Sequence, residues 1–144
     1  MITYKDIKKA VNTLLIKQFG IEINSNDVEE GFIRPSFFVS FDDTLRSSTV
    51  DQIEKSLTIR IYYFPTDRYN NSIELLEVQE ELENLFDLKL PVKDRLFNIF
   101  EAESVVTDGV LAFSFDIEFL EGREIEYGSV SNTELMQELD IRKV

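Results

Sequence analysis

Residues 95–120 read RLFNIFEAESVVTDGVLAFSFDIEFL, two runs of alternating residues on either side of Asp108-Gly109. Asp-Gly is a favoured two-residue turn between antiparallel strands. The stretch therefore predicts a hairpin with strands 95–106 and 110–120. Counting outward from the turn places four pairs on the buried face, namely Val106–Leu111, Ser104–Phe113, Ala102–Phe115 and Phe100–Ile117.

The opposite face of this predicted hairpin is acidic. Its pairs are Glu103–Ser114, Glu101–Asp116 and Ile99–Glu118, so it gathers the four carboxylates Glu101, Glu103, Asp116 and Glu118. Like charges placed directly opposite each other are unfavourable, by roughly a few tenths of a kcal/mol for an exposed pair. Two interpretations stay open, a solvated outer face of a sheet or a surface whose negative charge has a function.

The first half of the chain predicts one helix and three strands. Residues 3–19 have the period of an amphipathic helix, with Thr3 as its N-cap and Gly20 as its stop. A short strand and a loop are expected within residues 21–35. Residues 36–46 and 56–64 alternate as strands and predict a long hairpin, joined by a polar turn over residues 42–51.

The second half predicts an acidic helix over residues 73–87 before the hairpin. The residues expected to be buried in it are Ile73, Leu76, Leu82, Leu85 and Phe86. Residues 121–133 are predicted to form a loop, and residues 133–139 a short helix. The order of elements predicts a single α+β domain over residues 1–144, a mainly antiparallel sheet with helices packed on one face. Residues 121–144 are expected to form a peripheral C-terminal extension.

Composition limits the chemistry that the chain can perform. The 144 residues include neither His nor Cys, which excludes histidine catalysis, histidine metal sites and disulfides. The net charge is −13, and residues 72–144 hold almost all of it, which argues against binding to nucleic-acid phosphates. Sequence motifs for phosphate-binding loops, dinucleotide sites and zinc proteases are absent. We therefore predict no catalytic residue, no cofactor and no metal. The lack of a signal peptide or a long apolar segment predicts cytoplasmic synthesis.

Residues 29–41 read EEGFIRPSFFVSF and place Arg34-Pro35 directly before an apolar predicted strand. Pro35 is expected to enter the first long strand where no backbone donor is needed. Arg34 either pairs with Glu29 or Glu30 in the same chain or reaches a neighbouring subunit, and both readings stay open. Elsewhere, Arg60 lies in the middle of a predicted strand and is expected to pair with a carboxylate across the sheet.

Several stretches together resemble phage tail terminator proteins, also described as tail completion or tail-to-head joining proteins of tailed phages and prophages. They are ITYKDIKKAVNTLLIKQF at 2–19, GFIRPSFFVSF at 31–41, YYFPTD at 62–67 and the acidic helix that follows. The resemblance covers about residues 2–120. It implies a structural protein of the virion tail, assembled in the host cytoplasm, that forms a homo-oligomeric ring, commonly a hexamer. The ring would cap the head-proximal end of the tail tube, stop tube growth and join the head.

The resemblance also implies partners. These are further copies of the chain, the tail tube protein and the head–tail connector protein, without sequence-specific binding of nucleic acid and without a membrane. For such a ring we expect loops 42–55 and 65–72 to take part in subunit or tube contacts through Arg46 and Arg68, with Arg34 as a third candidate. The acidic face is a candidate wall of the lumen through which DNA passes. Two alternatives are an acidic DNA-mimicking inhibitor and a small carboxylate- or metal-dependent enzyme.

Overall fold

The computed structural model describes residues 2–24 and 33–122. The described residues divide into two compact units, a larger one within 2–24, 33–45 and 56–119 and a smaller one within 46–55 and 120–122. That the whole chain forms one domain stays a prediction. The predicted C-terminal helix at 133–139 lies outside the described residues.

Two helices and seven strands are described. In chain order they are α1 (Tyr4–Phe19), β1 (Glu22–Asn24), β2 (Ser36–Ser48), β3 (Gln52–Phe64), α2 (Ser72–Leu85), β4 (Leu88–Val92), β5 (Arg95–Ile99), β6 (Ala102–Thr107) and β7 (Val110–Gly122). Five strands form one sheet in the order β1-β2-β3-β7-β6, and β4 pairs with β5 in a second sheet.

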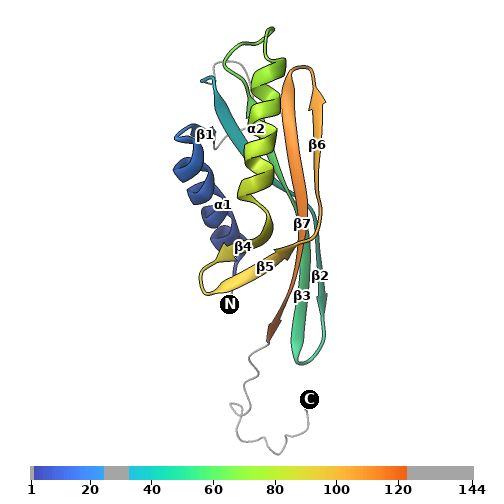
Figure 1. Cartoon of the computed structure of the whole chain (residues 1–144). Coiled ribbons are helices and arrows are strands. Elements are labelled where there is room, and N and C mark those ends of the chain that lie inside the picture. Colours follow the sequence, from blue (N-terminus) through green and yellow to red (C-terminus); the bar gives the residue numbers. More distant parts are fainter. Residues whose placement is uncertain (1, 25–32, 123–144) are drawn as a thin grey trace, which may run out of the picture. The chain divides into compact units, whose positions relative to one another are not determined.

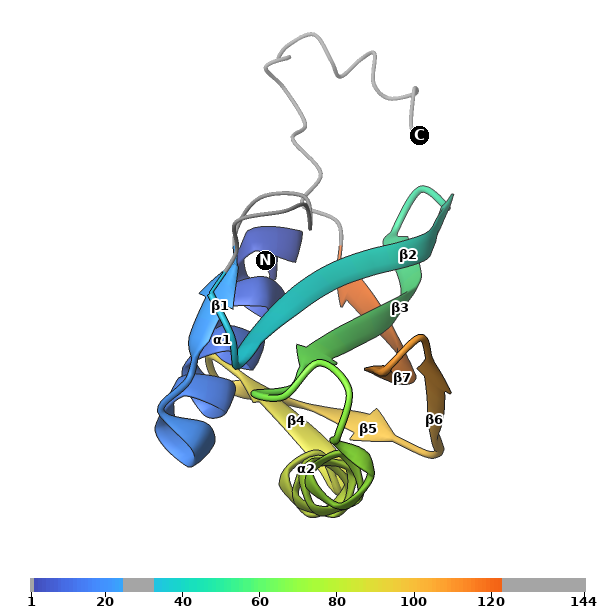
Figure 2. The ribbon, with the colours of Figure 1, turned by 90° about the horizontal axis from the view of Figure 1, so that it is seen from above.

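The architecture confirms the predicted α+β class with a mainly antiparallel sheet. In the larger unit, α1, α2 and the β4–β5 hairpin lie on one side of the five-stranded sheet (Figures 1 and 2). The side chains of β3 and β7 alternate between buried and accessible positions. The inward set is largely aromatic and branched, and includes Leu57, Ile59, Ile61, Tyr63, Leu111, Phe113, Phe115, Ile117 and Phe119. This alternation is the pattern of a sheet with one covered face.

The first helix has the ends that the sequence predicts. The Thr3 hydroxyl accepts a hydrogen bond from the Asp6 backbone N–H, while the Asp6 carboxylate accepts one from the Thr3 backbone N–H. This reciprocal bonding satisfies two otherwise unpaired donors at the helix start. Gly20 ends the helix with φ of 65°, a left-handed conformation that glycine adopts without steric cost.

The predicted turn at Asp108-Gly109 is confirmed, with φ of 54° and 75° at these two residues. The register is also as counted from the turn for six pairs, from Thr107–Val110 outward to Ala102–Phe115. The strand prediction was wrong beyond that point. The stretch 95–106 is two strands, because β5 pairs with β4 and not with β7; β4 itself was not predicted from the sequence.

This break changes the expected partners of three residues. Ile99 lies opposite Leu88 and not Glu118, and no pairing of Glu101 with Asp116 or of Phe100 with Ile117 is formed in the described hairpin. Phe100, expected in the core, is 90% exposed. It lies between β5 and β6, where the chain passes from one sheet to the other.

Residues 42–51 were predicted to form a turn, and this was wrong. Strand β2 continues to Ser48, and β3 already begins at Gln52. Asp42 is held in the strand by Arg60, whose Nη1 lies 2.6 Å from Asp42 Oδ2. The expected cross-sheet partner of Arg60 is thereby confirmed, and the acidic pair at 42–43 is part of a strand.

The buried side of α2 was predicted correctly for Leu82 and Phe86, which are buried, and wrongly for Ile73 and Leu76. Ile73 and Leu76 are 67% and 62% exposed, whereas the buried residues within the helix are Leu75, Val78 and Leu82. The helix is rotated from the predicted orientation because Glu74 is drawn toward β3. Its Oε2 accepts hydrogen bonds from the Tyr63 hydroxyl at 2.5 Å and from Thr66 N at 2.9 Å.

Candidate functional site: an acidic depression and two sheet edges

An acidic depression of about 480 Å³ lies at the end of the β6–β7 hairpin that is far from the Asp108-Gly109 turn. Its lining comes from the end of β5, the connection to β6 and the facing part of β7. The residues are Asn98, Phe100, Glu101, Ala102, Glu103, Ser114, Phe115, Asp116 and Glu118. All four carboxylates that the sequence assigned to one acidic face therefore surround one hollow.

The four carboxylates reach the depression by different routes. Glu103 lies opposite Ser114 in the ladder, as predicted. Asp116 accepts a hydrogen bond from the Thr58 hydroxyl at 2.6 Å, which joins β7 to β3 on the sheet face away from the helices. Glu101 lies in the connection before β6, and Glu118 lies farther along β7. Within residues 2–24 and 33–122, no ion pair involves any of the four.

The depression gathers negatively charged side chains. Among the described residues, no group of three acidic side chains is close enough to hold a metal ion. The lining residues include four carboxylates and no positively charged side chain, and Lys89 donates a hydrogen bond to the lining residue Asn98. Unpaired carboxylates around a concave surface repel polyanions over roughly a Debye length, about 8 Å at physiological salt.

The three arginines predicted at an interface lie in different surroundings. Arg34 donates a hydrogen bond from Nη1 to the Pro65 carbonyl at 3.1 Å, and its guanidinium lies 6.0 Å from the centre of the Phe64 ring. It therefore contacts the end of β3 in its own chain. Its predicted partners Glu29 and Glu30 fall outside the described residues. Arg46 and Arg68 are both exposed, and Arg46 Nε lies 3.3 Å from Ser48 Oγ.

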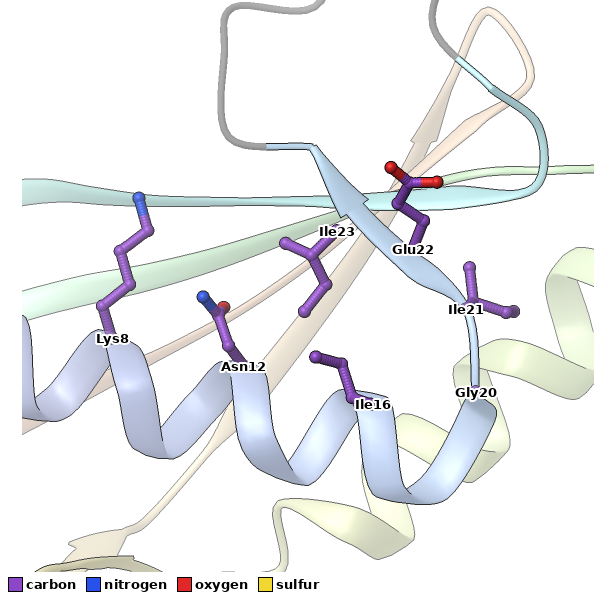
Figure 3. Close-up of a pocket in the computed structure, with 7 residues that line it drawn as sticks. All are labelled: Lys8, Asn12, Ile16, Gly20, Ile21, Glu22 and Ile23. Atoms are coloured by element: carbon purple, nitrogen blue, oxygen red, sulfur yellow. The ribbon is translucent and has the colours of Figure 1, made fainter.

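A second hollow, which the sequence did not predict, lies between α1 and the edge strand β1. It measures about 600 Å³ and is lined by Lys8, Asn12, Ile16, Gly20, Ile21, Glu22 and Ile23 (Figure 3). Asn12 Oδ1 is buried there and has no hydrogen-bond partner. Within the described ranges, only one other buried side-chain polar atom lacks a partner, Ser104 Oγ on β6. A buried polar atom without a partner is costly, so each of these positions requires an explanation.

Neither helix in the described part of the chain is long and apolar enough to span a bilayer.

Comparison with known proteins gives one informative match. Residues 6–129 match the sequence model of a family described as phage tail terminator protein. No curated protein matches the chain. Fifteen solved chains match it, and one of them aligns with 88% of this chain and 99% of its own length at 10% identity and a TM-score of 0.43. A likeness that weak carries no argument about function.

Proposed function

The chain belongs to the phage tail terminator family, and from this membership we propose that it forms a ring that caps the head-proximal end of the tail tube. In this role the ring stops addition of tube subunits and presents the surface that the head joins. A location in the virion tail and a structural role follow from the family itself. The match over residues 6–129 is the observation that carries the proposal.

A ring subunit needs contacts with its neighbours, with the tube below and with the connector above. The partners proposed are further copies of this chain, the tail tube protein and the head–tail connector protein. Exposed Arg46 and Arg68 remain candidates for the tube contact, because they are positive side chains on a strongly acidic chain. Arg34 is a weaker candidate, since it already bonds to Pro65.

The acidic depression fits the wall of a lumen that DNA crosses. A wall that carries Glu101, Glu103, Asp116 and Glu118 would repel phosphates and keep DNA from adhering during passage. The absence of an ion pair at these carboxylates within the described ranges supports this reading, because their full charge is left to act outward. A lumen lined with unpaired carboxylates needs no sequence-specific contact with DNA.

Removal of this protein during phage assembly tests the proposed function. Tails made without it should exceed the normal length and fail to join heads, and gold-labelled antibody should mark one end of normal tails. Tails of unchanged length, joined to heads in the absence of the protein, would contradict the proposal. Cryo-electron microscopy of normal tails tests the lumen proposal. If Glu101 and Asp116 lie on the outer wall of the ring, the acidic depression does not line the lumen, while the proposed role in ending the tail is unaffected.

A further inference from the structure

The five-stranded sheet has two edges of different character. Its order places β1 at one end and β6 at the other, so within residues 2–24 and 33–122 each pairs with a single strand. The outer backbone N–H and C=O groups of an edge strand are available to another chain. β6 bears none of the lysines or prolines that usually protect an edge, and its Val105 and Val106 are each about half exposed.

The β1 edge is flanked by one side of α1. Lys8, Asn12 and Ile16 follow each other at four-residue spacing, and all three line the hollow beside β1 (Figure 3). Ile16 is 53% exposed, although it lines the same hollow as Ile21 and Ile23. This flank of α1 therefore combines a positive charge, an exposed apolar side chain and the unpaired Oδ1 of Asn12.

The β6 edge is flanked by α2. The β6–β7 turn meets the start of this helix, because a Cβ on Gly109 would lie 3.2 Å from Asn71 Nδ2. The opposite side of α2 faces α1, since Glu81 and Leu85 share a shallow hollow with Gln18 of α1. The flank of α2 turned away from α1 then follows from helical geometry. It bears Leu76, Gln79 and Glu83.

These two flanks are complementary. The α2 flank carries Glu83 and the α1 flank carries Lys8, while Glu22 of β1 also lines the hollow beside α1. As whole helices, α2 has five glutamates and no basic residue between Ser72 and Leu85, and α1 has four lysines and one aspartate. Leu76 and Ile16 are both exposed apolar side chains. The unpaired Ser104 hydroxyl is able to donate a hydrogen bond, and the unpaired Asn12 Oδ1 is able to accept one.

The orientation of the two edges is also compatible. Ser104 lies opposite buried Phe113, so it belongs to the sheet face that the helices cover, the side on which Asn12 of α1 also lies. If β6 of one copy continues the sheet beside β1 of another, the helices of both copies stay on the same side. The acidic flank of α2 then meets the basic flank of α1.

We propose that the occupant of each edge is a second copy of this chain. The β6 edge with the α2 flank of one subunit docks beside the β1 edge with the α1 flank of the next. The contact joins two different surfaces, so successive copies add head to tail and close when the rotation allows. This inference rests on the proposed function, because it names the joint of the proposed ring.

Cross-linking through introduced cysteines tests the joint. The chain contains no Cys, so the introduced cysteines are the only thiols in each variant. Glu22 and Val105 are both exposed. Their chain neighbours Ile23 and Ser104 lie opposite the core residues Phe37 and Phe113, so Glu22 and Val105 lie on the sheet face away from the helices. Purified tails containing the double variant Glu22→Cys/Val105→Cys, treated with a short bismaleimide, should yield a ladder of covalent oligomers. Each single variant should stay monomeric, because identical edges do not meet.

The matched control is Glu22→Cys/Asp94→Cys, which moves the second thiol to the exposed β4–β5 turn. This pair should give no ladder. Tails of normal length that contain the Glu22→Cys/Val105→Cys variant and give no ladder would overturn the inference and leave the proposed function standing. If wild-type protein is missing from tails, both fail.

A charge exchange gives a second readout that needs no thiol chemistry. Lys8→Glu alone and Glu83→Lys alone should each reduce the amount of protein per tail several-fold, because like charges then meet across the joint. A chain with both substitutions restores opposite signs at every joint and should recover incorporation. A double variant as defective as the two single variants combined would overturn the contact.

Discussion

α1 and α2 have similar lengths, 16 and 14 residues, but different interactions hold them in place. α1 carries its own end signals, the reciprocal Thr3–Asp6 bonds and the left-handed Gly20. α2 begins at Asn71 without a side-chain cap bond and ends at Phe86 without a left-handed residue. Its position depends on contacts with the sheet. The ends of a helix that is capped by its own residues can be predicted from the local sequence. The buried side of a helix that is held by tertiary contacts cannot.

The largest expected effect separates the two sides of α2. Leu82 is fully buried and Leu76 is 62% exposed, although both are leucines of the same helix. Leu82→Ala should lower the free energy of unfolding by about 2–5 kcal/mol, because it removes buried methyl groups and leaves a cavity. Leu76→Ala should change it by less than about 0.5 kcal/mol. Urea unfolding of the three proteins measures both values. Equal losses would show that α2 buries the side predicted from sequence.

A smaller effect tests the tertiary anchor of α2. Glu74→Ala removes the acceptor of the buried Tyr63 hydroxyl and should cost about 1–3 kcal/mol. Glu80→Ala, an exposed change in the same helix, is the control and should be close to neutral. If both variants unfold at the same urea concentration, the Tyr63–Glu74 bond does not position the helix.

Alkaline titration gives this anchor an independent signature. Burial, and next the hydrogen bond to Glu74, raise the pKa of Tyr63 above its ordinary value. A raised folded pKa means that the contribution to stability is present below about pH 10 and is lost as pH rises further. The Tyr63→Phe variant should lack this alkaline loss, which unfolding measured on both sides of about pH 10 detects.

The smallest expected effect concerns the cap of α1. Thr3→Ala removes one side-chain acceptor and should cost about 1 kcal/mol. Thr13→Ala, at an exposed position inside the same helix, should cause no loss, because alanine favours helix. A Thr3→Ala protein as stable as the wild type would mean that the cap adds nothing beyond the packed stripe of α1.

The same cap makes a prediction about acid. The hydrogen bond from the Thr3 backbone lowers the pKa of Asp6 below its ordinary value. A lowered folded pKa means that this contribution is present above about pH 4 and is lost as pH falls through the lower folded value. Asp6→Asn should therefore show a weaker acid dependence between about pH 5 and pH 2 than the wild type.

The contrast between the helices also explains which features were predictable from sequence. The Thr3–Asp6 cap and the Asp108-Gly109 turn depend on residues a few positions apart, and both were predicted correctly. The strand break at Phe100 depends on the pairing of β5 with β4. Strand β4 begins three residues after the end of α2, and no Gly, Pro or Asn marks a turn between them. Leu88 begins β4 with φ of 69°, a conformation that leucine rarely adopts.

The candidate site shows the same division. The four acidic residues were placed together because their register follows from the turn at Asp108-Gly109. The hollow beside β1 brings α1 against a strand of three residues, and its polar signal is the single residue Asn12. Nothing in the spacing of Asn12 distinguishes it from a solvated asparagine on a helix. Its burial becomes apparent only when the packing of α1 on the sheet is known.

The acidic depression has a further consequence that concerns the environments a virion meets. The chain has no histidine, and histidine is the side chain whose unperturbed pKa falls between about pH 5 and 8. The carboxylates around the depression therefore have no neighbour within the same chain that switches its charge over this interval. Dissolved salts, and multivalent cations above all, are then the variables to which this surface responds.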